Sequence, residues 1–356
     1  MWKIICAYVL LITCSFVNGD PKVPCYFIFG DSLSDAGNNN NLVTNATANF
    51  PPYGVDFPGG VATGRFTNGL TSVDIITKLV EIDGLISPFS TASGRDILKG
   101  VNYASGGSGI LSESGSHLGD RIWLARQVQN HAITISKLQS MVDGPRSVNK
   151  YLNKCLYTMN IGSNDYINNY FMPKFYSSMK NFTHEQFATI LVTEYEQQIK
   201  ALYDYGARKT AIFGIGLIGC TPAEMRIHNA IFCVDEINDA VGILNKKLLE
   251  LVKSLNKKLA GAKFTFIDIS GVQNASPFAI GPLADMTCCE LRSDYQCKPN
   301  VRPCRFRDLY AFMDGFHPTE IVHKLTAKLA FNSPLRLFVN PVDIKTLISF
   351  NTASEI

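Results

Sequence analysis

Short runs of β-branched and aromatic residues alternate along this chain with longer amphipathic segments. The short runs predict five strands, at residues 25–29, 98–103, 155–160, 211–215 and 264–269. Apolar residues at three- or four-residue steps predict helices between them, at residues 72–81, 122–141, 184–205 and 235–259. Strands that alternate with helices at this spacing pair in parallel and need helices on both faces. We therefore expect an α/β fold in three layers around a parallel sheet of about five strands.

The length and charge of the chain indicate how many domains to expect and which partners to exclude. With 356 residues, 46% of them hydrophobic, the chain can bury one large core, and we expect a single domain over residues 20–356. The net charge is only +3 and the basic residues are scattered, so nucleic acid is not expected as a partner. The composition does not indicate an oligomeric state.

The first residues have the anatomy of a signal peptide. Lys3 precedes an apolar stretch at residues 4–17, and Gly19 supplies a small residue for cleavage. We expect residues 1–19 to be removed and the protein to be secreted; a buried N-terminal helix is the alternative. No other segment is apolar over a length that spans a bilayer, so no integral membrane segment is expected after cleavage. Candidate sites of N-glycosylation begin at Asn45, Asn181 and Asn274.

Cysteine usage agrees with an extracellular location. Eight cysteines follow residue 19, at positions 25, 155, 220, 233, 288, 289, 297 and 304. An even number in an oxidising compartment predicts disulfides, and short separations favour Cys220 with Cys233 and pairing within positions 288–304. Cys25 and Cys155 would pair if their strands are neighbours. A zinc site is the alternative for the last group, but the adjacent Cys288 and Cys289 lack the separation usual for zinc ligands, so no metal is expected.

Polar turns follow the predicted strands. Gly30-Asp31-Ser32 follows the first strand, the glycines at 106–107 follow the second, and residues 162–165 follow the third. A long cysteine-rich loop after the fifth strand leads to residues 314–318. Ligand sites of open α/β sheets form outside the carboxyl ends of the strands, so we expect these four turns to meet at one edge.

One of these turns carries a serine that can act as a nucleophile. A serine hydroxyl needs a base within hydrogen-bond reach, and His317 follows Asp314 by three residues. That spacing lets the carboxylate hold Nδ1 while Nε2 faces Ser32. The alternatives are a simple turn or helix cap at Ser32, and an Asp314 that caps the helix beginning near Thr319. The order of the turns along the sheet favours the catalytic interpretation.

Ester hydrolysis also needs donors for a tetrahedral oxyanion. The backbone N–H groups of Ser32 and Gly107 and the side-chain amide of Asn164 are the candidates. Taken one by one, Gly107 fits a flexible loop and Asn164 a polar turn. No Gly-x-Ser-x-Gly elbow occurs, which argues against an ordinary α/β-hydrolase. A cysteine nucleophile is disfavoured because Cys25 and Cys155 fall in buried strands.

Several blocks resemble one known family. FGDSLSDAGNNN at 29–40, PPYG at 51–54 and TGRFTNG at 63–69 are followed by NYASGGSGI at 102–110, IGSND at 161–165 and DGFHPTE at 314–320. Together they resemble the plant-type GDSL esterase/lipase family of the SGNH hydrolase superfamily, over about residues 24–335. Two departures stand out: Met313 replaces a frequent tryptophan, and residues 276–284 follow the usual pattern only loosely.

The resemblance implies a flavodoxin-like α/β/α sandwich, with Ser32, Asp314 and His317 as catalytic triad. It implies Ser32, Gly107 and Asn164 as oxyanion donors, no cofactor, and a small-molecule, lipid or carbohydrate ester as substrate. In a plant, secretion would place such an enzyme in the apoplast or cell wall. An acyltransferase with the same residues is the nearer alternative, and a non-catalytic binding protein is the more distant one.

Overall fold

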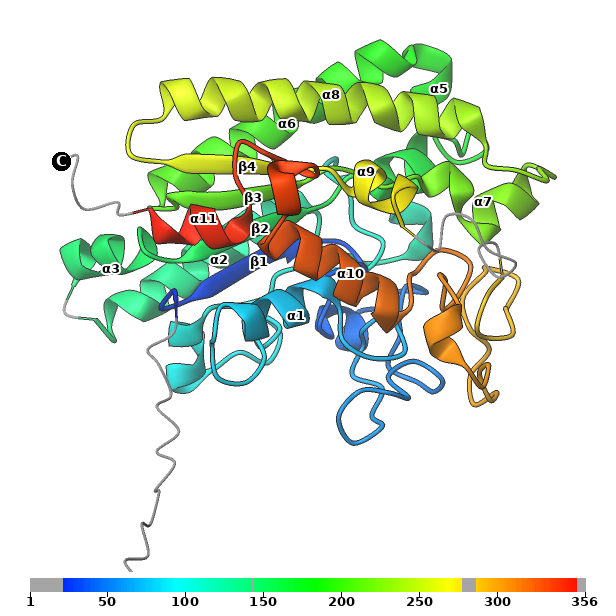
Figure 1. Cartoon of the computed structure of the whole chain (residues 1–356), viewed down its shortest axis with the longest axis horizontal. Coiled ribbons are helices and arrows are strands. Elements are labelled where there is room, and N and C mark those ends of the chain that lie inside the picture. The colour runs from blue at the N-terminus through cyan, green and yellow to red at the C-terminus, as the bar shows by residue number, and fades with distance from the viewer. Residues whose placement is uncertain (1–21, 143, 277–285, 351–356) are drawn as a thin grey trace, which may run out of the picture.

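A single mixed sheet organises the structure, a computed structural model that describes residues 22–142, 144–276 and 286–350. The strands lie side by side in chain order: β1 (Tyr26–Gly30), β2 (Leu156–Asn160), β3 (Lys209–Phe213), β4 (Lys263–Ile267) and β5 (Val339–Asn340). The first four are parallel, and the short β5 is antiparallel to β4. The predicted α/β class is confirmed (Figure 1).

One predicted strand is wrong. Residues 98–103 do not form a ladder; residues 94–99 form a 3-10 turn, and Gly100 has a φ of 115°. A Cβ at Gly100 would lie 1.9 Å from the Tyr26 oxygen, so this close approach to β1 requires glycine. The chain then runs beside β1 through a single bridge between Ile28 and Asn102. The sequence analysis also missed β5, because two residues are too few to show an alternating pattern.

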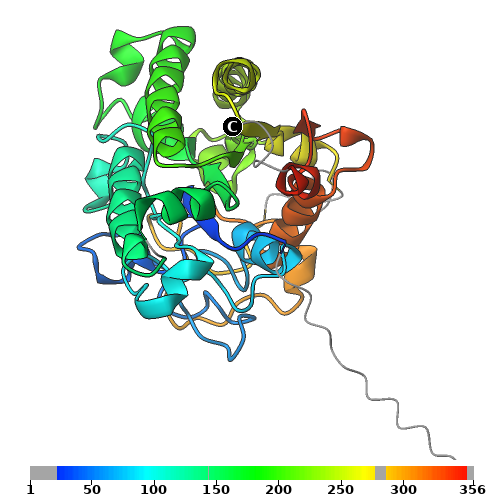
Figure 2. The ribbon, with the colours of Figure 1, turned by 90° about the vertical axis from the view of Figure 1, so that its left-hand side faces the viewer.

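Helices cover both faces of the sheet. The expected helices are present as α1 (Ser72–Leu79), α2 (Leu124–Gln139), α6 (His184–Asp204) and α8 (Asp235–Lys258), with α10 (Glu320–Phe331) and α11 (Ile344–Ser349) after them. Short helices are α3 (Pro145–Leu152), α4 (Ser163–Asp165), α5 (Ser178–Asn181), α7 (Pro222–Ile227) and α9 (Ile269–Asn274). The helices α2, α6 and α8 share a core with one face of the sheet, and α1, α10 and α11 with the other. Figure 2 shows the sheet between these two layers.

Alternating side chains of the strands feed the two cores. Phe27 and Phe29 of β1 enter the core on the side of α2, whereas Tyr26 and Ile28 enter the core on the side of α1. This is the period of two expected for a strand buried on both faces. The sheet is therefore fixed on both sides, and the turns after its strands start from rigid positions.

A third, smaller cluster lies under the cysteine-rich loop, which we define as residues 286–305. The buried residues of this cluster are Ala46, Ala48, Tyr53, Phe66, Cys288, Cys289, Cys297 and Met313. Disulfides join Cys288 to Cys304 and Cys289 to Cys297 within this loop. In Figure 1 the loop (orange) lies at the end of the molecule that also holds the loops after β1 (blue).

The other two disulfides also agree with expectation. Cys25–Cys155 joins the starts of β1 and β2, which are neighbours, and Cys220–Cys233 closes the segment around α7. No group of three or more metal-binding side chains occurs within the described residues. Across the same residues, none of the helices combines the length and apolar character needed to cross a bilayer.

Candidate active site

The turn after β1 presents Ser32. Gly30, the last residue of the strand, has no room for a side chain, because a Cβ would lie 2.8 Å from the Asn160 oxygen. Gln127 of α2 fixes this residue from the other side, with Oε1 accepting from the Gly30 amide and Nε2 donating to its carbonyl. Asp31 then begins a tight turn. The Asp31 carbonyl accepts from the backbone amides of residues 34 and 35. Ser32 thus leaves the strand at a fixed angle.

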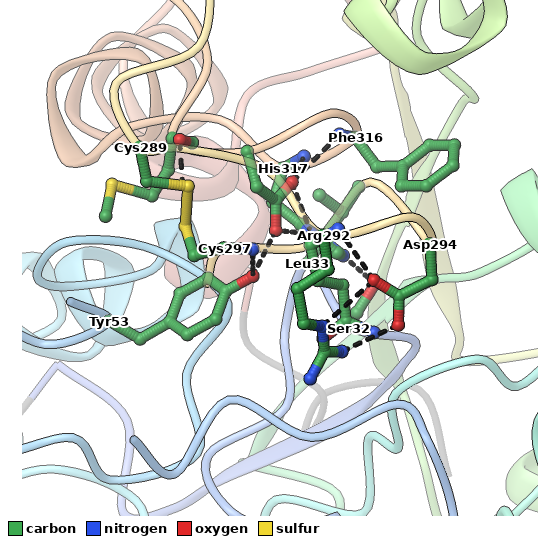
Figure 3. A network of polar contacts seen from close by, with 12 residues as sticks. Ser32, Leu33, Tyr53, Cys289, Arg292, Asp294, Cys297, Phe316 and His317 are labelled. Atoms are coloured by element: carbon green, nitrogen blue, oxygen red, sulfur yellow. Dashed lines mark hydrogen bonds and ion pairs between the residues drawn. A yellow bond between two sulfur atoms is a disulfide. The ribbon is translucent and has the colours of Figure 1, made fainter. Parts of the chain in front are cut away.

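The structure brings Ser32, His317 and Asp314 together. The Ser32 Oγ lies 2.8 Å from His317 Nε2, and His317 Nδ1 lies 2.8 Å from Asp314 Oδ2 (Figure 3). Asp314 Oδ1 also accepts from the backbone amides of Phe316 and His317, at 2.8 Å each. The turn ends at Thr319, the N-cap of α10, as the sequence predicts. The imidazole is therefore oriented by its own turn.

Asp314 is completely buried, and its pKa reflects a competition. Burial by itself raises the pKa of a carboxyl group. The charge of His317 and the hydrogen bonds from His317, Tyr53 and the Phe316 amide outweigh burial and hold the pKa of Asp314 below its usual value. Asp314 is thus an anion beside a histidine that can accept a proton.

Two backbone amides and one side-chain amide are available near the turn. Among the described residues, the amides of Ser32 and Gly107 donate to no protein acceptor. Asn164 Nδ2 gives one proton to the Ser108 carbonyl at 2.9 Å, and Asn168 Nδ2 donates to Asn164 Oδ1 at 2.6 Å. These bonds fix the orientation of the Asn164 amide and leave its second N–H proton uncommitted.

Asp35 holds the loop that carries Gly107, a role that the sequence analysis missed. Its Oδ1 accepts from the amides of Gly37 and Asn38, and its Oδ2 accepts from the amide of Gly106 at 2.9 Å. The carboxyl group is completely buried, and burial raises its pKa to about 6.

Asp165 plays the matching role beside Asn164. It accepts from the amides of Ile110 and Leu111 and from the Ser114 hydroxyl, at 2.7, 3.0 and 2.7 Å. Burial raises its pKa to about 6 as well. The aspartates at 35 and 165 occur in two of the polar blocks, and this placement was the available signal for their role.

Asp31 differs from these two carboxyl groups. Its Oδ1 accepts from the Leu33 amide at 3.0 Å, but its Oδ2 is buried without a partner in the described structure. Burial raises the pKa of Asp31 to about 7. A buried carboxyl group with a single donor thus lies next to Ser32 in the chain.

Tyr53 is a further residue of the site that the sequence analysis missed. Its hydroxyl donates to Asp314 Oδ2, and the Cys297 amide donates to the Tyr53 oxygen at 3.2 Å (Figure 3). Tyr53 lies in the block PPYG, which the sequence analysis used only as a mark of resemblance. Phe66 lies beside the site too, with its ring centroid 4.7 Å from that of His317.

The remaining histidines have other surroundings. His131 of α2 and His323 of α10 are buried, and burial lowers their pKa values to about 3 and about 4. His228 lies 3.5 Å from Glu224, and His184 lies 3.7 Å from Glu236. A nearby acid therefore does not by itself distinguish His317; its contact with Ser32 does.

The structure also bears on the predicted glycosylation sites, the first residues and the two departures from the family pattern. Asn45, Asn181 and Asn274 are exposed, and their glycosylation stays a prediction. Residues 1–19 lie outside the described residues, as does most of the segment 276–284. Met313 is fully buried in the third cluster, where its amide donates to the His317 carbonyl at 2.8 Å, so this departure is accommodated beside His317.

Comparisons with known proteins identify the family of the chain. Residues 26–330 match the model of the family GDSL-like Lipase/Acylhydrolase. Similar proteins of Arabidopsis thaliana include GDSL esterase/lipase At1g29660, 43% identical with 97% of each chain covered, and GDSL esterase/lipase At2g19010, 45% identical with 91% of this chain and 93% of the relative covered. By these matches the chain belongs to the GDSL-like lipase/acylhydrolase family, the group that the sequence blocks resemble, and is a carboxylic ester hydrolase.

Proposed function

We propose that this protein is a secreted serine esterase that hydrolyses carboxylic esters through an acyl-enzyme on Ser32. The observation that carries the proposal is the continuous chain of contacts from Ser32 Oγ through His317 to a buried, anionic Asp314. A serine hydroxyl is a weak nucleophile until such a base removes its proton.

The reaction has two steps. In the first, His317 Nε2 takes the Ser32 proton as Oγ attacks the ester carbonyl, and the same proton then leaves with the alcohol. In the second, His317 removes a proton from water, the hydroxide attacks the acyl-enzyme, and Ser32 regains a proton as the acid departs. Asp314 holds the imidazole by Nδ1 and stabilises its charged form in both steps.

The oxyanion of both tetrahedral intermediates needs preorganised donors. We assign this role to the amides of Ser32 and Gly107 and to the uncommitted Nδ2 proton of Asn164. Removal of one such donor typically lowers kcat by about 10² to 10³. Asp35 and Asp165 support the assignment, because they hold the two loops that carry these donors.

Secretion and a single domain are part of the same proposal. The apolar stretch at residues 4–17 and the four disulfides support an oxidising, extracellular destination, which in a plant is the apoplast or cell wall. One continuous sheet from β1 to β5 supports a single domain over residues 20–356. The substrate is a small-molecule, lipid or carbohydrate ester, with water as acceptor.

The test is turnover of p-nitrophenyl butyrate by Ser32→Ala. We expect kcat to fall by at least about 10³-fold, since the nucleophile is lost. Ser34→Ala is the matched control, because Ser34 lies in the same turn and its buried Oγ has no partner among the described residues. Full turnover by Ser32→Ala would rule out the mechanism. A dominant transfer product with an added alcohol would instead make the protein an acyltransferase.

A further inference from the structure

The acid of the proposed triad has a partner outside the triad. We propose that Tyr53 is a positioning residue for ester hydrolysis: its hydroxyl holds the Asp314 carboxylate in place, and the cysteine-rich loop fixes that hydroxyl. The inference rests on the proposed function, because it assigns a task to Tyr53 only if Asp314 and His317 act on Ser32.

The hydrogen-bond pattern determines the direction of donation. The Cys297 amide can only donate, so the Tyr53 oxygen accepts from it at 3.2 Å. The single hydroxyl proton of Tyr53 then goes to Asp314 Oδ2, the oxygen that lies 2.8 Å from His317 Nδ1. Burial and the negative charge of Asp314 raise the pKa of Tyr53 well above its usual value, so this proton stays on the phenol.

The ring of Tyr53 is fixed by its neighbours. Its exposed fraction is 1%, and the rings of Phe50 and Phe66 contact it edge-on, with centroids 5.4 and 6.2 Å away. Phe66 also packs against the imidazole of His317. Because the ring has no room to turn away, the hydroxyl is held on Asp314 at little further cost in conformational entropy.

The cysteine-rich loop supports both ends of this contact. One of the two disulfides of this loop joins Cys289 to Cys297, whose amide donates to the Tyr53 oxygen. The amide of Cys289 donates at 3.0 Å to the carbonyl of Met313, the residue before Asp314. One disulfide therefore links the support of the Asp314 backbone to the support of its side chain. This arrangement is that of a preorganised positioning shell.

Loss of the Tyr53 hydroxyl has a defined chemical consequence. A hydrogen bond to a carboxylate stabilises its charged form, so without it Asp314 becomes more basic and holds a protonated imidazole more strongly. Other ionisable groups that face the site are Asp31 after β1, Arg292 of the cysteine-rich loop and His323 of α10. A Tyr53→Phe substitution leaves all three in place, so a shift in the pH profile reports the lost hydroxyl.

The experiment compares Tyr53→Phe with wild type on p-nitrophenyl butyrate between pH 4 and 9. We expect kcat to fall about 5- to 20-fold with KM within about twofold, and the pH of half-maximal kcat/KM on the acid side to rise by about half a unit or more. Tyr26→Phe is the matched control, because Tyr26 is equally buried and shares a 2.8 Å hydrogen bond with Thr158. We expect it to lower the melting temperature but to leave the pH profile unchanged.

Two outcomes overturn the inference: a wild-type rate and profile in Tyr53→Phe, or an equal loss at every pH, which would mean that the hydroxyl does not act through the protonation of Asp314 and His317. Thermal melting of both variants shows that each is folded. Ser32→Ala, measured in parallel, separates the two proposals. If Ser32→Ala is inactive and Tyr53→Phe behaves as wild type, only the role of Tyr53 fails; if Ser32→Ala keeps its activity, the proposed function fails.

Discussion

Two buried aspartates accompany Ser32, and their protonation differs. Asp314 and Asp31 are both within 1% of complete burial, and burial raises the pKa of each. Asp314 nevertheless has a lowered pKa, because of the charge of His317 and the hydrogen bonds that His317, Tyr53 and two backbone amides donate to it. Asp31 has a single backbone donor and one unpartnered oxygen, and its pKa rises to about 7. Burial alone therefore does not determine the charge; the adjacent charge of His317 and the hydrogen-bond donors decide it.

This difference assigns the two groups different tasks. An anionic carboxylate stabilises the imidazolium that forms during acyl transfer. Asp314 is ionised throughout the neutral range, whereas Asp31 keeps its proton for much of the time below pH 7. Asp314 is thus suited to act with His317, and Asp31 is suited to a structural role in the turn. The pKa of Asp35, about 6, falls between those of Asp31 and Asp314, and Asp35 has three backbone donors.

The largest effect is expected for Asp314→Asn. The neutral amide keeps the shape of the side chain but cannot stabilise the imidazolium and favours the wrong tautomer of His317. We expect kcat/KM for p-nitrophenyl butyrate to fall by about 10³ to 10⁴ at pH 7.5. Steady-state kinetics check this value, with Asp31→Asn as the matched substitution. Equal losses in the two variants would remove the distinction between the two aspartates.

A smaller effect is expected for Asp35→Asn. The amide puts a donor where the carboxylate accepts from backbone N–H groups, so the loop with Gly106 and Gly107 loses one anchor. We expect kcat to fall about 10- to 100-fold with little change in KM, because a misplaced oxyanion donor acts mainly in the transition state. Initial rates over a range of substrate concentrations separate the two constants. A change in KM alone would contradict the role given to Asp35.

The smallest effect on activity is expected for Asp31→Asn. Asparagine resembles the protonated acid that this site favours, so kcat/KM at pH 6 should stay within about threefold of wild type. The same kinetic assay checks this outcome. A loss of more than about 10²-fold would show that an ionised Asp31 is needed.

The stability of Asp31→Asn also tests the difference in pKa between Asp31 and Asp314. Because the pKa of Asp31 is higher in the folded protein than in the unfolded chain, the folded state binds more protons between about pH 4 and 7. The favourable contribution of this group is complete below pH 4 and is lost as pH rises towards 7. Asp31→Asn should therefore gain stability relative to wild type across this window, by about 4 kcal/mol at most. Urea unfolding at pH 4.5 and 7.5 measures it, and a constant difference would contradict the raised pKa.

The sequence predicts the scaffold well where its patterns are long. The helix over 235–259 follows from a clear apolar period and the strand before Ser32 from an unbroken apolar run, and both are present as α8 and β1. The strand at 98–103 was wrong because apolar composition does not reveal the turn at Gly100. The two-residue β5 has no pattern to detect.

The residues of the site likewise fall into those that the sequence predicts and those that it does not. The proposed catalytic residues Ser32 and His317 follow a strand and precede a helix, so their meeting at one edge can be predicted from topology. The contact between Tyr53 and Asp314 joins residues 261 positions apart through loops, and no local period encodes it. The contrast between Asp31 and Asp314 is also hidden in the sequence, since both are aspartates near a serine or histidine. The ion pair with His317 and the hydrogen-bond donors separate the two.

The most direct test of the account is the site and rate of labelling by a fluorophosphonate probe. We predict one adduct per protein, found on the peptide that contains Ser32 and absent from Ser32→Ala. Labelling should slow by about 10³-fold or more in Asp314→Asn and stay near the wild-type rate in Asp31→Asn at pH 6. An adduct on another residue, or equal labelling rates in Asp314→Asn and wild type, would contradict the account.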